Sequence, residues 1–301
     1  VKIITAVLNA YLQIRILKTE NFYQLLLQYE TICNLKKYSS AGKLLKVCFL
    51  FYKWNQFFYG AEIEKSYRAI LEAKEIVDTS NIEDMALCAS IYWAYALSHK
   101  RITSIEQAIQ DYEEGLEKYP DSTILNVGLK LHQAHTFLRK QPEKSCEICE
   151  GVLENLKEDD CPYHEILQIR VDIVMSKFYA GQYTDALEKC EEVLQIARSV
   201  NASYQMGRLY NIYAAILLVL GDMDEAESYF SRSYHEFQES GNHLFAWRAE
   251  FNQAQLLSVR DKEAGAVRKF KALYSGGIPN MEERIQSLTL ENAELAAFLY
   301  T

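Results

Sequence analysis

Polar and apolar residues alternate along most of this 301-residue chain with the spacing of amphipathic helices. Apolar side chains recur three and four residues apart, which is the pattern of a helix that buries one face. Glycine (12) and proline (4) are scarce, so the chain offers few of the residues that tight turns between strands need. The pattern therefore predicts an all-α protein.

Two segments repeat this pattern with the same small and apolar positions. GQYTDALEKCEEVLQIA begins at Gly181 and GDMDEAESYFSRSYHEF begins at Gly221, so the repeat length is 40 residues. An alanine recurs at this spacing, and an apolar residue follows each alanine by four residues, one helical turn along the same face. These positions are Ala186, Ala226 and Ala266, with Cys190, Phe230 and Phe270. Such periodicity is typical of repeat proteins.

A second small residue precedes several of these alanines by twelve positions. Ala214 precedes Ala226, and Ala254 precedes Ala266. Small side chains let two antiparallel helices approach closely, so we expect each repeat to be a helix pair. One pair cannot bury its apolar face alone and must stack on the next pair.

The periodicity predicts one repeat domain over residues 1–301. It consists of lead-in helices within 1–40, about six helix pairs over 41–275, and a closing helix at 281–300 after the break SGGIPN. The predicted pairs are 41–59 with 62–78, 83–99 with 104–118, 122–139 with 143–157, 163–180 with 183–199, 203–220 with 223–239, and 243–259 with 261–275. Expected helix caps are Asp222, Ser203, and Asp121 or Ser122.

One segment also carries a family pattern. SIEQAIQDYEEGLEKYP resembles the second helix of the tetratricopeptide repeat (TPR), with its alanine, aromatic, small residue and proline in order at Ala108, Tyr112, Gly115 and Pro120. Later repeats lack the proline and run to 40 residues, which resembles the repeats of peptide-responsive bacterial regulators and some eukaryotic adaptors. The resemblance implies a right-handed superhelix of stacked antiparallel helix pairs, a TPR-like solenoid.

Charge and hydropathy exclude several classes of function. The formal net charge is -9, and no run of Lys and Arg could displace the counterions of a nucleic acid, so this segment is not expected to bind one directly. No apolar stretch reaches the 18 residues of a membrane span. The seven cysteines mostly fall in apolar helical patterns, which favours a reducing, cytoplasmic environment.

Motifs for catalysis are scarce. The sequence contains no GxxxxGK[ST], GxGxxG, GxSxG or HExxH, so we predict no enzyme and no cofactor. A remote alternative is a zinc site with three cysteines and one histidine at suitable spacing. Its ligands would be Cys146, Cys149, Cys161 and His164. Cys149 falls at the core position that Cys190 takes in the next repeat, so packing is the preferred interpretation.

Candidate ligand-binding residues follow from the resemblance. In the TPR family the first helix of each pair lines a concave groove, and counting back from Ala226 and Ala266 places a polar stripe there. The stripe is Arg208, Asn211, Arg248, Asn252 and Gln255, with Gln168, Asp172, Tyr52 and Asn55 at equivalent places. Amides suit a peptide backbone, and Arg suits a carboxylate. The alternative is a solvated surface without a ligand.

The leading hypothesis is a peptide- or protein-binding sensor module of a signalling or transcription regulator. Because the chain begins at Val1, an effector domain is expected to precede it. The alternative is a constitutive interaction scaffold, which could form a homodimer. A metal-dependent enzyme is the remote alternative, and its only support is the Cys and His spacing.

Overall fold

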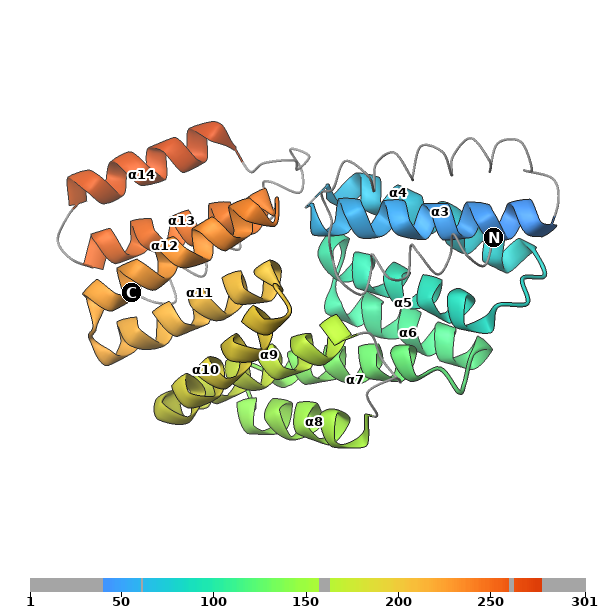
Figure 1. Cartoon of the computed structure of the whole chain (residues 1–301), viewed down its shortest axis with the longest axis horizontal. Coiled ribbons are helices and arrows are strands. Elements are labelled where there is room, and N and C mark those ends of the chain that lie inside the picture. Colours follow the sequence, from blue (N-terminus) through green and yellow to red (C-terminus); the bar gives the residue numbers. More distant parts are fainter. Residues whose placement is uncertain (1–39, 61, 157–162, 260–262, 278–301) are drawn as a thin grey trace. The chain divides into compact units, whose positions relative to one another are not determined.

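The computed structural model describes residues 40–60, 62–156, 163–259 and 263–277 (Figure 1). Within these ranges every regular element is an α-helix. The helices are α3 (Ser40–Tyr59), α4 (Ile63–Thr79), α5 (Met85–Ile102), α6 (Ile105–Lys118), α7 (Thr123–Phe137), α8 (Pro142–Asn155), α9 (Tyr163–Tyr179), α10 (Tyr183–Ser199), α11 (Ser203–Leu220), α12 (Met223–Glu239), α13 (His243–Val259) and α14 (Glu263–Gly276). The lead-in helices predicted before Ser40 and the closing helix predicted at 281–300 lie outside the described residues.

The helices form the six predicted pairs. We call the first helix of each pair an A helix (α3, α5, α7, α9, α11 and α13) and the second a B helix (α4, α6, α8, α10, α12 and α14). Residues group into two compact units, one with α3 as far as Phe58, α4 to α8, and α9 as far as Ile169, the other with the residues from Arg170 onward and the short segment Tyr59–Glu62. The all-α stack of pairs is confirmed, whereas the single domain over 1–301 stays a prediction.

The small residues of the repeat lie where helices touch. Ala108, Ala186 and Ala226 are 0% exposed and Ala266 is 3% exposed. Two glycines also lie at close contacts between helices. Gly128 of α7 lies against the ring of Tyr112 of α6, and Gly207 of α11 lies against the ring of Phe237 of α12. At both contacts the absence of a side chain at the glycine makes room for the aromatic ring.

Glycine also ends the A helix of one repeat and so fixes the next turn. Gly221 has a φ of 90°, and its N–H donates to the carbonyls of Leu217 and Leu218. This left-handed conformation costs glycine little. Asp222 then caps α12 by accepting from the N–H of Glu225, as predicted.

The other two predicted caps had different outcomes. Ser122 caps α7 by accepting from the N–H of Leu125. Ser203 does not cap α11, because it is already the first helical residue. Ala202 takes the cap position and has no side chain that could accept a hydrogen bond. The predicted start of this helix at residue 203 is correct, so the error lay in assigning the cap to the first helical residue and not to the residue before it.

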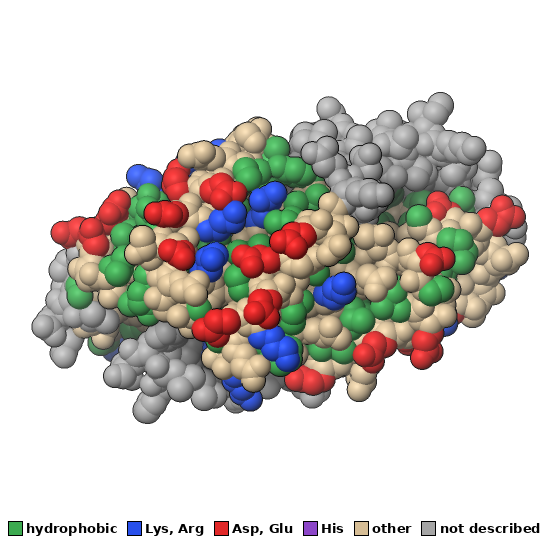
Figure 2. Space-filling view, turned by 90° about the horizontal axis from the view of Figure 1, so that it is seen from below, with side chains coloured by type: hydrophobic (Ala, Val, Ile, Leu, Met, Phe, Trp, Pro, Cys, Tyr) green, Lys and Arg blue, Asp and Glu red, His purple; other side chains and the backbone are tan. Residues whose placement is uncertain are grey.

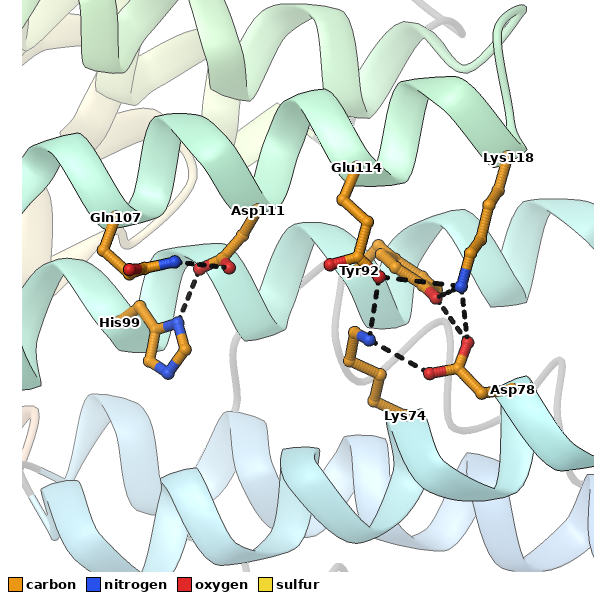
Figure 3. Close-up of polar contacts among 8 residues, drawn as sticks. All are labelled: Lys74, Asp78, Tyr92, His99, Gln107, Asp111, Glu114 and Lys118. Carbon is orange, nitrogen blue, oxygen red and sulfur yellow. Dashed lines mark hydrogen bonds and ion pairs between the residues drawn. The ribbon is translucent and has the colours of Figure 1, made fainter.

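In the unit with α3 to α8, a ring of four alternating charges joins the B helices α4 and α6 (Figure 3). Lys74 contacts Asp78 (3.0 Å) and Glu114 (3.1 Å), and Lys118 contacts Asp78 (3.0 Å) and Glu114 (3.6 Å). The hydroxyl of Tyr92, from α5, donates to Asp78 and accepts from Lys118. We call these four charged residues the charge ring. Because every charge has two opposite neighbours, the ring closes without a net charge.

No helix in the described part of the chain combines the length and hydropathy that a membrane crossing needs.

Candidate functional site

Three A helices of the unit that begins at Arg170 are joined by polar side chains. The Nη2 of Arg208 in α11 lies 3.5 Å from Oδ1 of Asp172 and 3.4 Å from Sδ of Met175, both in α9. The amide of Asn252 in α13 donates to Oδ1 of Asn211 in α11 over 2.7 Å. The ladder Asp172–Arg208 and Asn211–Asn252 therefore runs from one A helix to the next.

The Asp172–Arg208 pair is largely shielded from water. The side chain of Asp172 is 2% exposed and that of Arg208 is 16% exposed. A buried carboxylate needs a paired charge, so the arginine offsets part of the cost of burying Asp172. The pair consequently fixes where the guanidinium of Arg208 lies.

The stripe continues along α13. Arg248, Asn252 and Gln255 are spaced by four and three residues, so they share one face of this helix. Arg248 is exposed, with its guanidinium carbon 5.4 Å from the centre of the Phe245 ring, and Gln255 is half-buried. These side chains present amide and guanidinium groups side by side with Asn211.

The remaining predicted positions lie elsewhere. Tyr52 and Asn55 of α3 are 2% and 5% exposed, so both side chains lie in the packed interior. Gln168 is half-buried in the part of α9 that precedes Arg170. In this first pair, Ser66 of α4 stands where the later repeats have an alanine, so the pattern gave the count for Tyr52 and Asn55 a weaker starting point.

A second polar cluster was not predicted from the sequence. Nδ1 of His99 in α5 lies 2.6 Å from Oδ2 of Asp111 in α6, and Nε2 lies 2.9 Å from the hydroxyl of Tyr67 in α4. A carboxylate only accepts, so Nδ1 donates to Asp111. His99 and Asp111 are 9% and 6% exposed. Figure 3 shows this pair beside the charge ring, and both clusters tie together α4, α5 and α6.

The predicted zinc ligands are only partly within the described residues. Cys149 is fully buried in α8 and Cys146 is half-buried, whereas Cys161 lies outside the described ranges. Among the residues that are described, no group of three metal-binding side chains converges. Cys149 occupies the core position that the repeat predicts for it.

Comparison with known proteins identifies the fold. No protein-family model matches the sequence, and no curated protein matches it significantly. The crystal structure of NprR in complex with its cognate peptide NprX is similar with a TM-score of 0.67 and 15% identity, covering 97% of this chain and 83% of that chain. A Rap protein complexed with competence and sporulation factor gives 0.64 and 18% identity, covering 91% and 76%.

A third similar structure is aspartyl phosphate phosphatase F from Bacillus subtilis. Its TM-score is 0.55 at 19% identity, with 84% of this chain and 65% of that chain covered. At such identities the similarity establishes the fold and leaves function open. The chain is a TPR-like stack of helix pairs, as its repeats predict.

Proposed function

We propose that this chain is a peptide-binding sensor module of a signalling or transcription regulator, and that its ligand lies along α9, α11 and α13. The observation that carries the proposal is the bond between Asn211 and Asn252, which joins equivalent faces of two successive A helices. An amide pair across two repeats is a surface on which an extended backbone can be held at regular intervals.

The chemistry of the stripe suits such a ligand. An extended peptide presents N–H and C=O groups in alternation, and each asparagine amide can both donate and accept. Binding would exchange the Asn211–Asn252 bond for bonds to the ligand, so no buried polar group is stranded. Arg208 and Arg248 add planar donors that can hold a carboxylate with two parallel bonds.

The similar structures support this interpretation by what they contain. The NprR structure contains its cognate peptide NprX, and the Rap structure contains competence and sporulation factor. A sensor of this kind would act in the cytoplasm without a cofactor, and we propose no catalytic step for it.

Substitution of the amide pair tests the proposal. The full chain, the variant Asn211→Ala with Asn252→Ala, and a control Asn155→Ala would be titrated with a pool of synthetic heptapeptides while thermal unfolding is followed. Asn155 is exposed on α8, where its amide donates only to the carbonyl of Gly151. We expect a ligand that raises Tm of the wild-type chain and the control but not of the double variant. A pool that shifts none of the three proteins would reject the proposal.

The second candidate is a constitutive interaction scaffold, possible for any repeat stack that presents a continuous surface. Light scattering on the same samples separates the two. A tight homodimer whose Tm no peptide changes would favour the scaffold.

A further inference from the structure

Acidic and basic residues are distributed differently over the two kinds of helix. The six A helices together carry ten Lys and Arg but only three Asp and Glu. The six B helices carry eleven Lys and Arg and twenty-three Asp and Glu. Four A helices (α3, α5, α7 and α11) contain no acidic residue at all. A chain with a net charge of -9 thus has A helices of net positive charge.

Burial alone does not produce this distribution. A more buried helix loses charged residues of both signs, because transfer of either charge out of water is costly. Here the two kinds of helix have nearly equal numbers of cations, and only the anions are missing from the A helices. Several of these cations reach solvent, since Lys43, Lys130 and Arg248 are exposed. The depletion is therefore specific for negative charge.

The A helices of each unit share one layer, so their charges act together. In the unit with α3 to α8, the indole of Trp54 donates to the hydroxyl of Ser98, which joins α3 to α5. Nζ of Lys100 lies 2.7 Å from Nδ1 of His135, which joins α5 to α7. In the other unit the polar ladder joins α9, α11 and α13.

The B helices, which we call the B layer of each unit, carry most of the acidic residues. The charge ring joins α4 to α6 there. On the face shown in Figure 2, which is not assigned to either kind of helix, acidic side chains are more evident than basic ones. The acidic character of the whole chain therefore comes from the B helices.

None of the three acidic residues of the A helices adds an unpaired negative charge to the exposed part of the stripe. Asp172 is held against Arg208. Glu250 follows Arg248 by two residues and so lies on the opposite side of α13 from Arg248, Asn252 and Gln255. The third, Glu165, precedes Arg170 and belongs to the other unit. Arg248 consequently sets the sign of the charge on the exposed part of the stripe.

We propose that the ligand of α9, α11 and α13 is an acidic peptide, whose side-chain carboxylates face the cations of these three A helices while its backbone lies on Asn211 and Asn252. This inference rests on the proposed function and specifies the class of its ligand. A surface of one sign raises the local concentration and association rate of an oppositely charged ligand. The acidic B layer repels the same peptide and restricts it to the A helices.

Three blocked hexapeptides with a neutral dye test the proposal. They share one sequence except for three positions, which are Glu, Gln or Lys. Binding to the full chain would be followed by fluorescence anisotropy at 50 mM and 500 mM salt. We expect the Glu peptide to bind at least about tenfold more tightly than the Gln peptide at low salt, with the advantage reduced at high salt because surface charges are screened.

Charge reversal on each layer provides the matched comparison. Arg248→Glu, on the A helix α13, is expected to weaken the Glu peptide at least about tenfold and to favour the Lys peptide. Arg232→Glu is the control: Arg232 is exposed on the B helix α12 of the same unit, stacked 4.8 Å from the Tyr229 ring centre. It should leave both affinities within about twofold, the ordinary effect of a distant surface charge.

The outcomes distinguish this inference from the proposed function. If the Gln or Lys peptide binds as well as the Glu peptide, and the Asn211→Ala, Asn252→Ala variant abolishes that binding, the ligand is a peptide but the acidic preference is wrong. If none of the three hexapeptides binds, the titration with the heptapeptide pool shows whether the chain binds any peptide. A hit without Asp or Glu overturns the acidic preference alone, and no hit at all overturns both proposals.

Discussion

Gly207 of α11 faces the ring of Phe237 of α12 so closely that a Cβ at position 207 would lie 2.8 Å from the ring carbon Cε1. The hydroxyl of Ser233 donates to the carbonyl of Gly207 over 2.7 Å, which holds the same two helices together. The ring is 2% exposed and packed among buried residues, so it cannot simply move aside.

Gly207→Ala is therefore expected to destabilise the chain by about 1–3 kcal/mol, the usual cost of overpacking, despite the better helix propensity of alanine. Urea unfolding followed by circular dichroism measures the change. Gly151→Ala is the matched control, because a Cβ there meets nothing within 4 Å, and it should stabilise α8 by about 0.5–1 kcal/mol. Equal effects of the two substitutions would contradict the close packing.

The charge ring predicts a pH-dependent contribution from Asp78. Burial raises the pKa of this carboxyl, but hydrogen bonds from Tyr92, Lys118 and Lys74 outweigh burial and hold the pKa below its ordinary value. A lowered folded-state pKa gives stability that is present above the unfolded-state pKa and lost as pH falls through the folded-state pKa.

Asp78→Asn should accordingly cost about 1 kcal/mol or more at pH 7, since it removes charge-assisted hydrogen bonds. The difference between variant and wild type should shrink as pH falls below about 4, the ordinary range of an aspartate. Urea midpoints of both proteins at pH 7, 5 and 3 measure it. A difference that is the same at all three pH values would exclude the ring as its source.

The pKa of Glu236 is shifted in the opposite direction to that of Asp78. Burial raises the pKa of its carboxyl above the ordinary value, so the folded state prefers the protonated form. Stability from this group is present below the unfolded-state pKa and is lost as pH rises through the folded-state pKa.

Glu236→Gln is expected to raise the urea midpoint at pH 7, with no gain at pH 4, where the glutamic acid is already protonated. Glu188→Gln, an exposed residue on α10, should change the midpoint little at either pH. A lower midpoint for Glu236→Gln at pH 7 would show that the carboxylate is the favoured form.

Thiol reactivity should follow burial. Cys190 is 0% exposed, and burial raises the pKa of its thiol. Its Sγ also donates to the carbonyl of Leu209 over 3.5 Å. Cys146 is half-buried on α8. Because the thiolate is the reactive form, maleimide labelling of the native chain with peptide mapping should modify Cys146 well before Cys190. Comparable labelling of both would place Cys190 at an accessible surface.

The features that sequence reasoning identified depend on local periodicity. The alanines of the repeat are set by spacing within one or two helices, and the structure confirms the buried position of Ala226. Gly221, which the repeat marks only by its spacing, ends α11. Helix ends were less certain. The helix predicted at 83–99 extends to Ile102, because the last turn of α5 continues until Ser104 caps the next helix.

Contacts between helices could not be predicted in the same way. Tyr67 and His99 are 32 residues apart, and His99 and Asp111 are 12 apart. The spacing of 32 does not match the repeat. The spacing of 12 equals that of the paired small residues, but which side chains meet at that spacing depends on how each helix is rotated. The Asn211–Asn252 contact could have been predicted, because the sequence separation of 41 between its partners is nearly one repeat length.

The charge ring also has a consequence for the order of the repeats. In α6, Glu114 follows the repeat residue Ala108 by six positions, and Lys118 follows it by ten. The same count from the buried Ser145 gives Gly151 and Asn155 in α8, neither of which can complete the ring. If α8 followed α4 directly, Lys74 and Asp78 would have no counterions from the next repeat. The charge ring thus makes the contact between α4 and α6 specific for this order of repeats. In a chain with its repeats in another order, the charges of α4 would face a B helix that lacks the complementary charges.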